Sequence, residues 1–239
     1  MKGKKQRALR FAIVIGLSAS ALAQTSPSAN DVAELRVRIE SSLPGRHPSV
    51  PAVIWLDPAP GEAAPPAMPR GRYTLLQKNR TFIPHLQVIP VDSVVQFPNQ
   101  DPFFHNVFSL FDGKRFDLGL YEAGSSKSVT FSRIGVSYIF CNIHPEMSAV
   151  IIALATPYYA IASPNGAFLL HSVVPGDYTM HVWIEGVPQS QLDHLVRPVH
   201  LPPHAVDLGV IQAPILRPSN LKHDNLYGKA YPPESQSPY

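Results

Sequence analysis

Apolar residues occur along the chain in short runs, and residues that favour turns separate one run from the next. The chain has 26 prolines and no long stretch of helical periodicity. Short apolar runs bounded by turn residues are typical of strands in sandwiches and barrels. The sequence therefore predicts an all-β protein. In the first part of the chain, the predicted strands lie at residues 35–39, 53–56, 82–89, 94–97, 128–131, 136–140 and 149–155.

A second group of short β runs begins near Thr156. Its predicted strands lie at residues 158–162, 167–170, 178–184, 195–200 and 205–211, with turns at 163–166 and 174–176. The chain then becomes polar and proline-containing, which is typical of a segment without a core of its own. We therefore expect one β domain at residues 24–155, a smaller β-sandwich at 156–216 and a flexible tail at 217–239.

The first 23 residues have the pattern of a secretory signal peptide. Residues 1–10 carry five basic and no acidic side chains, an apolar run follows at 11–22, and Ala21 and Ala23 end it. A basic head, a short apolar middle and an Ala-x-Ala end are typical of such peptides. The apolar run is too short to span a bilayer comfortably, and no later run approaches that length. The mature chain is therefore predicted to be periplasmic or secreted, without a membrane span.

The charge balance argues against a nucleic-acid-binding protein. The chain has 20 Lys and Arg against 17 Asp and Glu, but the signal peptide holds five of the basic residues. The mature part then has 15 basic and 17 acidic residues, a formal net charge of −2. It also lacks the basic stripe that is typical of nucleic-acid-binding surfaces.

Cysteine usage is unusual for an exported protein. Such proteins normally pair their cysteines in disulfides, yet this chain has a single cysteine, Cys141. A lone thiol in an oxidising compartment needs protection, which metal coordination or deep burial can give.

The residues around Cys141 favour metal coordination. Cys141, His144 and Met147 form a C-x2-H-x2-M loop after a predicted strand, and His105 lies upstream. Thiolate and thioether sulfur suit the cuprous ion, while imidazole nitrogen also serves the cupric ion. Two His and one Cys with a weak axial Met form a type 1 copper site. Each residue alone could be a core or turn residue, but the combination predicts one copper ion at His105, Cys141, His144 and Met147.

Other metal and catalytic sites fit the sequence less well. Thioether sulfur is a poor zinc ligand. A thiol hydrolase would need a cation or a helix N-terminus to lower the pKa of Cys141, and neither is evident. A multicopper oxidase would need H-x-H pairs, which the remaining histidines do not form, and His85 is interpreted as a surface residue. No catalytic residue is predicted, and the protein is not expected to be an enzyme.

Residues 80–155 resemble the cupredoxins, the superfamily of plastocyanin, amicyanin and azurin. The loop length is most similar to that of amicyanin. The resemblance implies an eight-stranded Greek-key β-sandwich or barrel with copper near one end, and it implies that Asn106 ties the two ligand loops together by hydrogen bonding. The positions that carry it are Phe82, Pro84, Val94, Phe97, Asn99, Asp101, His105, Asn106, Gly124, Phe131, Gly135 and the C-x2-H-x2-M loop.

The wider arrangement resembles bacterial plastocyanin-like proteins of the methylamine-utilisation type. Residues 156–216 resemble a carboxypeptidase regulatory-like domain, an Ig-like or transthyretin-like β-sandwich. This second resemblance rests on the turns that contain Asn165-Gly166 and Pro175-Gly176.

These patterns predict an exported blue copper protein that carries single electrons between redox partners. His144 is the expected electron port, so redox partner proteins would bind its face in brief encounters of small area. Two alternatives remain open: a copper carrier or buffer, and an envelope-binding module at residues 156–216 with a structural copper site. The sequence is compatible with a monomer and leaves the partner, the reduction potential and the oligomeric state open.

Overall fold

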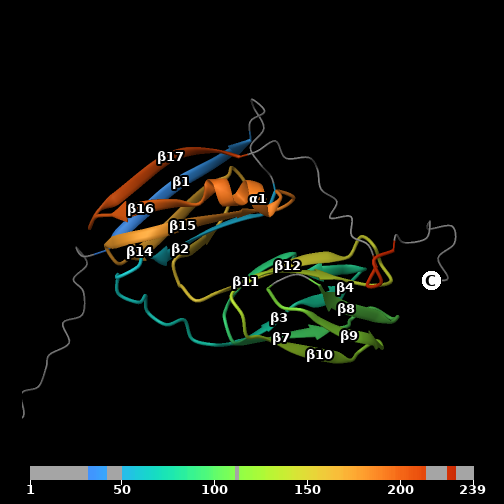
Figure 1. Ribbon diagram of the computed structural model, residues 1–239. Coiled ribbons are helices and arrows are strands. Elements are labelled where there is room, and N and C mark those ends of the chain that lie inside the picture. The colour runs from blue at the N-terminus through green and yellow to red at the C-terminus, as the bar shows by residue number, and fades with distance from the viewer. Residues whose placement is uncertain (1–31, 42–49, 111–112, 214–224, 230–239) are drawn as a thin grey trace, which may run out of the picture.

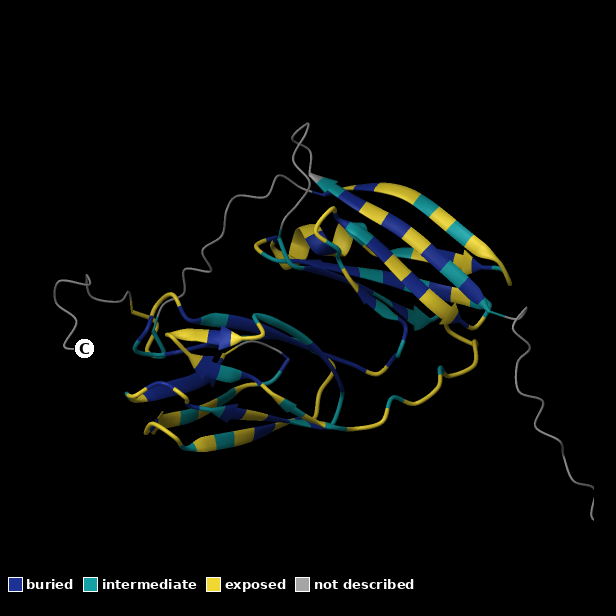
Figure 2. Ribbon diagram, turned by 180° about the vertical axis from the view of Figure 1, so that it is seen from behind, coloured by how far each residue is buried: buried dark blue, intermediate teal, exposed yellow. Residues whose placement is uncertain are grey.

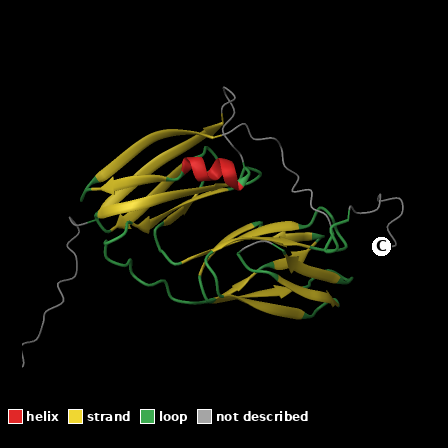
Figure 3. Cartoon of the chain, in the orientation of Figure 1, coloured by secondary structure: helices red, strands yellow, loops and turns green. Residues whose placement is uncertain are grey.

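The computed structural model describes residues 32–41, 50–110, 113–213 and 225–229. Within these ranges the chain is nearly all β, with only the short helices α1 (Gln189–Leu192) and η1 (Asp193–Leu195) (Figure 3). The predicted all-β class is therefore confirmed. The expected signal peptide at residues 1–23 lies outside the described residues, as does the expected tail at 217–239 apart from 225–229. None of the described helices has the length and apolar character needed to cross a bilayer.

The strands form two sandwiches that lie side by side (Figure 1). In the first, the sheet β6-β12-β11-β8-β9 packs against the sheet β10-β7-β3, and the pair β4-β5 adjoins them. Phe97, Phe131 and Ile139 are fully buried between the sheets. The strands are β3 (Arg72–Thr74), β4 (Leu76–Lys78), β5 (Thr81–Ile83), β6 (Leu86–Pro90), β7 (Ser93–Pro98), β8 (His105–Ser109), β9 (Phe116–Tyr121), β10 (Ser126–Phe131), β11 (Gly135–Phe140) and β12 (Ser148–Leu154).

The second sandwich combines the first and the last described strands of the chain, β1 and β17. Its sheets are β14-β1-β17 and β13-β2-β15-β16. The strands are β1 (Ala33–Ser41), β2 (Ala52–Pro58), β13 (Tyr159–Ile161), β14 (Ala167–Val173), β15 (Gly176–Ile184), β16 (Arg197–Leu201) and β17 (Ala205–Ala213).

This pairing corrects the predicted domain boundaries. Strand β1 pairs with β14 and β17, and β2 pairs with β13 and β15, so both belong to the second sandwich and not to a domain at residues 24–155. The first sandwich is thus inserted between β2 and β13. The apolar pattern identified both strands, but a pattern local to one strand carries no information on which distant strand will pair with it.

Strand β12 is buried on both faces and joins the two sandwiches. Because successive side chains of a strand point to opposite faces, Ala149, Ile151 and Ala153 face the core of the first sandwich. The alternate residues, Val150, Ile152 and Leu154, belong to the core that the second sandwich forms. The continuous apolar run in this strand follows from this double burial, and Figure 2 shows the buried residues along the contact between the sandwiches.

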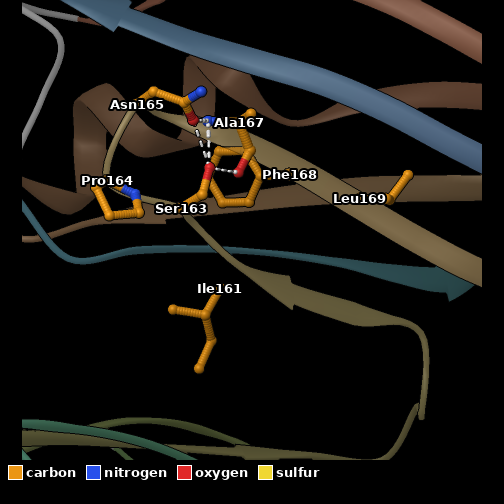
Figure 4. A pocket seen from close by; sticks show the side chains of 7 residues that line it. All are labelled: Ile161, Ser163, Pro164, Asn165, Ala167, Phe168 and Leu169. Carbon is orange, nitrogen blue, oxygen red and sulfur yellow. Dashed lines mark hydrogen bonds between the residues drawn. The ribbon is translucent and has the colours of Figure 1, made fainter.

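The predicted turn at residues 163–166 is present and is held by short-range hydrogen bonds (Figure 4). The Ser163 hydroxyl lies 2.6 Å from Asn165 Oδ1 and 2.8 Å from the Ala167 carbonyl oxygen. Gly166 has φ of +75°, a conformation that side-chain-bearing residues adopt only at a cost. A surface pocket lies beside this turn, and the Ser163 and Asn165 side chains in its lining bond to each other. Its lining residues are Ile161, Ser163, Pro164, Asn165, Ala167, Phe168 and Leu169.

Polar contacts also link the sandwiches. His85 Nε2 lies 2.6 Å from Oε1 of Glu185, which directly follows β15 in the second sandwich. His85 Nδ1 lies 3.1 Å from the carbonyl oxygen of Ser148. The Trp183 indole N–H donates to the Tyr138 hydroxyl at 3.2 Å. The interpretation of His85 as a simple surface residue is therefore incomplete, because its ring bridges the two sandwiches.

The His85–Glu185 contact predicts a pH-dependent contribution to stability. The hydrogen bond between His85 and Glu185 holds the pKa of His85 above the ordinary 6.5, although burial of the ring opposes this shift. A raised folded-state pKa stabilises the fold fully below the unfolded pKa, and this stabilisation is lost as the pH rises through the folded pKa. We expect Glu185→Gln to lower the melting temperature more at about pH 5.5 than at about pH 8.5. Glu122→Gln, in an exposed turn of the first sandwich, is the control, and an equal loss at both pH values would contradict the role of this pair.

Candidate metal centre

Three potential metal ligands meet at one end of the first sandwich. His105 is the first residue of β8, Cys141 directly follows β11, and His144 lies in the loop that leads into β12. Their ligand atoms all lie within 4.8 Å of one another. The exposed fraction is 0% for His105 and Cys141 and 6% for His144, so the site is almost closed to water. The structure thus brings together three of the four residues that the sequence predicted as ligands in a geometry suited to one ion.

The distances between these atoms fit a first-row transition metal. Cys141 Sγ lies 3.7 Å from His105 Nδ1 and 3.5 Å from His144 Nδ1. Metal–nitrogen bonds of about 2.0 Å and metal–sulfur bonds of about 2.3 Å, spread at about 110–120°, place sulfur and nitrogen about 3.5–3.8 Å apart. Both sulfur–nitrogen distances therefore match those expected when the two atoms share one ion.

The environment of Cys141 keeps its thiol protonated when no cation is bound. Burial raises the pKa of Cys141, while the backbone N–H groups of Ile143, Asn106 and His144 act in the opposite direction. These N–H groups favour the thiolate once a cation has replaced its proton. The sulfur is therefore buried in a position prepared for the charged form.

Asp101 orients the first histidine. Its Oδ2 lies 2.8 Å from His105 Nε2, which leaves Nδ1 directed toward Cys141. The backbone N–H groups of Asn79 and Arg80 donate to the same carboxylate at 2.6 and 3.0 Å. Burial raises the pKa of Asp101, but these hydrogen bonds together lower it below its usual value. The carboxylate is therefore charged and fixed, which is a common arrangement behind a metal-binding His.

Met147 lies at the end of the ligand loop. It is 0% exposed and packs in the same apolar cluster as Cys141. The Cys141 N–H donates to the Met147 carbonyl at 3.3 Å, and the Met147 N–H donates to the His144 carbonyl at 3.0 Å. These bonds close the loop on itself, so the spacing of the C-x2-H-x2-M sequence matches a compact turn between β11 and β12.

The backbone and the side chain of Asn106 form hydrogen bonds with different partners. Its backbone N–H is one of those directed at the Cys141 sulfur, and it connects β8 to the ligand loop. Its side-chain amide donates instead to Asp117 Oδ1 on β9, at 2.7 Å. The connection between the ligand loops that the cupredoxin resemblance implies for Asn106 therefore runs through its main chain.

His144 is more deeply buried than an electron port was expected to be. Phe103 covers both imidazoles, with ring centroids 5.2 Å from His105 and 5.6 Å from His144. Burial, with His105 and Arg80 nearby, lowers the pKa of His144 to about 4. Its ring is therefore neutral, as metal binding requires, and its exposed part faces a pocket in the surface.

Asn99 and Asp101 shape this site, and the sequence alone gave neither of them a role. Asn99 Nδ2 donates to the Phe103 carbonyl at 2.7 Å, and Asn99 Oδ1 accepts from the Asp101 N–H at 3.0 Å. A polar residue, an Asp and a His spaced as N-x-D-x3-H could have indicated this network. A contact of the Leu226 N–H with Asn142 Oδ1, at 2.7 Å, was also not foreseen, since it joins a residue of the expected tail to the ligand loop.

Comparison with known proteins finds similarity in solved structures. No protein-family model matches the chain, and no curated protein matches it. The copper-containing nitrite reductase from Thermus scotoductus SA-01 is 24% identical, over 35% of this chain and 22% of its own, with a TM-score of 0.33. A purple cupredoxin from Nitrosopumilus maritimus is 21% identical, over 34% of this chain and 99% of its own, with a TM-score of 0.31. A mutant of amicyanin in the Cu(I) state is 15% identical, over 35% of this chain and 82% of its own, with a TM-score of 0.33.

Removal of the charge behind His105 should weaken metal binding. Asp101→Asn keeps the shape of the side chain but removes the carboxylate that fixes the imidazole. We expect the affinity for Cu(II) to fall about 10- to 100-fold, as measured by competition with a chelator. Asp207→Asn, on the second sandwich, is the matched control and should leave the affinity unchanged. An unaltered affinity in the Asp101 variant would show that packing alone orients His105.

Proposed function

We propose that this protein is an exported electron carrier with one type 1 copper ion, bound by His105, Cys141 and His144 with Met147 as the axial ligand. The observation that carries the proposal is the buried group of two imidazole nitrogens and one thiol sulfur at metal-ligand distances. The proposed axial position of Met147 is supported by its complete burial beside Cys141.

The donor set favours copper over zinc. A structural zinc site normally has four ligands drawn from Cys, His and carboxylate. Within the described residues, the group consists of His105, Cys141 and His144 and includes no carboxylate. Asp101 bonds to the far nitrogen of His105 and is thus occupied as an orienting group. Soft sulfur and imidazole together suit an ion that alternates between cuprous and cupric states.

The surrounding residues support electron transfer more than catalysis. Bound copper would supply or accept one electron at a time. His105 and Cys141 are closed to water, and hydrogen bonds hold both ligand loops, so the donor atoms need to move little between oxidation states. His144 lines the surface pocket and offers the shortest route to a redox partner protein. We therefore propose a carrier that is not itself an enzyme and that works in the periplasm or outside the cell.

Cupric loading of the purified full chain tests the site. We expect an intense blue or green-blue absorption from thiolate-to-copper charge transfer, together with a cupric electron-spin resonance signal. Cys141→Ala should abolish the colour, while His171→Asn, on the exposed face of β14, should retain it. A colour that survives the loss of Cys141 would exclude this assignment. Rapid release of copper to a partner without reversible redox would favour a copper carrier instead.

Met147 has a separate test. Met147→Leu nearly conserves side-chain volume, so packing should lose less than about 1.5 kcal/mol. Because an axial thioether donates electron density that favours Cu(II), its removal should raise the reduction potential while copper stays bound. The matched control is Met180→Leu, the same change at a fully buried position of the second sandwich. If voltammetry gives the same potential for both variants, Met147 is a core residue only.

A further inference from the structure

A pocket opens on the surface next to the proposed copper ligand His144. Its volume is about 470 Å³, which lies within the range of small-molecule binding sites, about 300–1,000 Å³. It is lined by Arg80, Phe103, Phe104, Leu120, Ile143 and His144. The lining is therefore apolar except for one cationic side chain and the imidazole edge.

The local structure of β9 exposes an apolar residue at this pocket. The pairing of β8 with β9 shifts register between Asn106 and Phe108, and Gly119 in β9 has φ of +63°. Asp117 fixes this irregularity, because its carboxylate accepts from the Gly119 N–H at 2.9 Å and from Asn106 Nδ2. An irregularity of this kind re-aims the side chains that follow it. Leu120 is consequently 60% exposed.

The exposed apolar surface continues across the pocket. Phe104, on the loop before β8, is 55% exposed. Large apolar side chains that gather around a concave surface indicate a binding site more than scattered surface residues do. Phe103 forms the inner part, between the pocket and the two imidazoles.

Arg80 gives the pocket its charge. It lies in the tight turn between β4 and β5, where Asn79 and Arg80 both have φ of 55°. Its guanidinium lies 5.4 Å from the Phe103 ring centroid, and within the described ranges it forms no ion pair with a carboxylate. The buried carboxylate of Asp101 bonds to the backbone N–H of Arg80 and to His105, and Asp101 lies outside the pocket lining. The guanidinium thus remains able to pair with an anion from solution.

We propose that this pocket binds a small organic anion with a flat apolar body, such as an aromatic carboxylate. The carboxylate pairs with the Arg80 guanidinium, and the ring lies against Phe104 and Leu120 near the edge of His144. Concavity and a single unpaired cation favour such a ligand over a protein, whose docking normally uses a broader surface with several polar contacts at its rim. Binding requires no copper. Its consequence, that an occupant blocks access of a redox partner to His144, rests on the proposed electron-transfer function.

The test uses the full chain without added metal and three probes. They are 2-naphthoate, its neutral isostere 2-naphthamide, and acetate, which has the charge without the apolar body. Isothermal titration and chemical-shift mapping would measure affinity and location. We expect 2-naphthoate to bind at least about tenfold more tightly than either other probe, with shifts at Phe104, Leu120 and His144, because a hydrogen-bonded charge adds to apolar contact.

Variants identify the residue responsible. Arg80→Gln should weaken 2-naphthoate about tenfold or more, and Arg80→Lys should retain part of the affinity. Arg133→Gln, in the turn between β10 and β11 at the opposite end of the first sandwich, should have no effect. No detectable 2-naphthoate binding, or equal binding of the amide, would overturn the proposal. The pocket beside His144 would then be assigned to contact with a protein partner. Failure of the copper proposal is read separately, from the spectrum after cupric loading, so each result stands independently.

Discussion

Removal of Cys141, His105 and His144 from water is the constraint on which the candidate site depends. Burial is the first cause of the raised pKa of Cys141 and of the lowered pKa values of both histidines. All three groups are therefore neutral without a metal, so the fold can keep them together at little electrostatic cost. A cation that binds then displaces the thiol proton and leaves a thiolate, toward which the backbone N–H groups are already directed. Burial thus lets the three side chains lie together as neutral groups and leaves their ligand atoms within 4.8 Å of one another.

The proposed ligands differ in how many parts of the fold hold them in position. Cys141 and Met147 are fixed by the ends of β11 and β12 and by their mutual backbone hydrogen bond. His105 depends in addition on Asp101, which reaches it from the preceding loop and is itself held by the turn at Asn79 and Arg80. The same turn also presents the Arg80 side chain at the pocket. One short connection therefore serves both the buried interior of the site and its outer face.

The sequence predicted the all-β class and placed Cys141 and His144 at ligand spacing, because strand periodicity and the C-x2-H-x2-M motif are local properties of the chain. His105 lies outside that motif and was predicted as the upstream ligand that completes the donor set. It did not predict that β1 and β2 join the second sandwich, since their pairing with β13, β14, β15 and β17 is decided by contacts across the whole chain. The role of Asp101 and the near-complete burial of His144 were missed for a related reason. Both arise from the way Phe103 and the turn at Asn79 fold over the ligands, and no spacing within one motif encodes that geometry.

The insertion of the first sandwich between β2 and β13 also constrains the order of folding. Strands β1 and β2 are synthesised long before their partners β13, β14, β15 and β17, so their apolar faces stay unpaired while the whole first sandwich is made. Pairing between distant segments is slow because the intervening loop must be closed first. If the first sandwich folds early, it brings its two ends together and shortens that search. The first sandwich would then lower the entropic cost of bringing β1 and β2 to their partners, and so help the second sandwich to assemble.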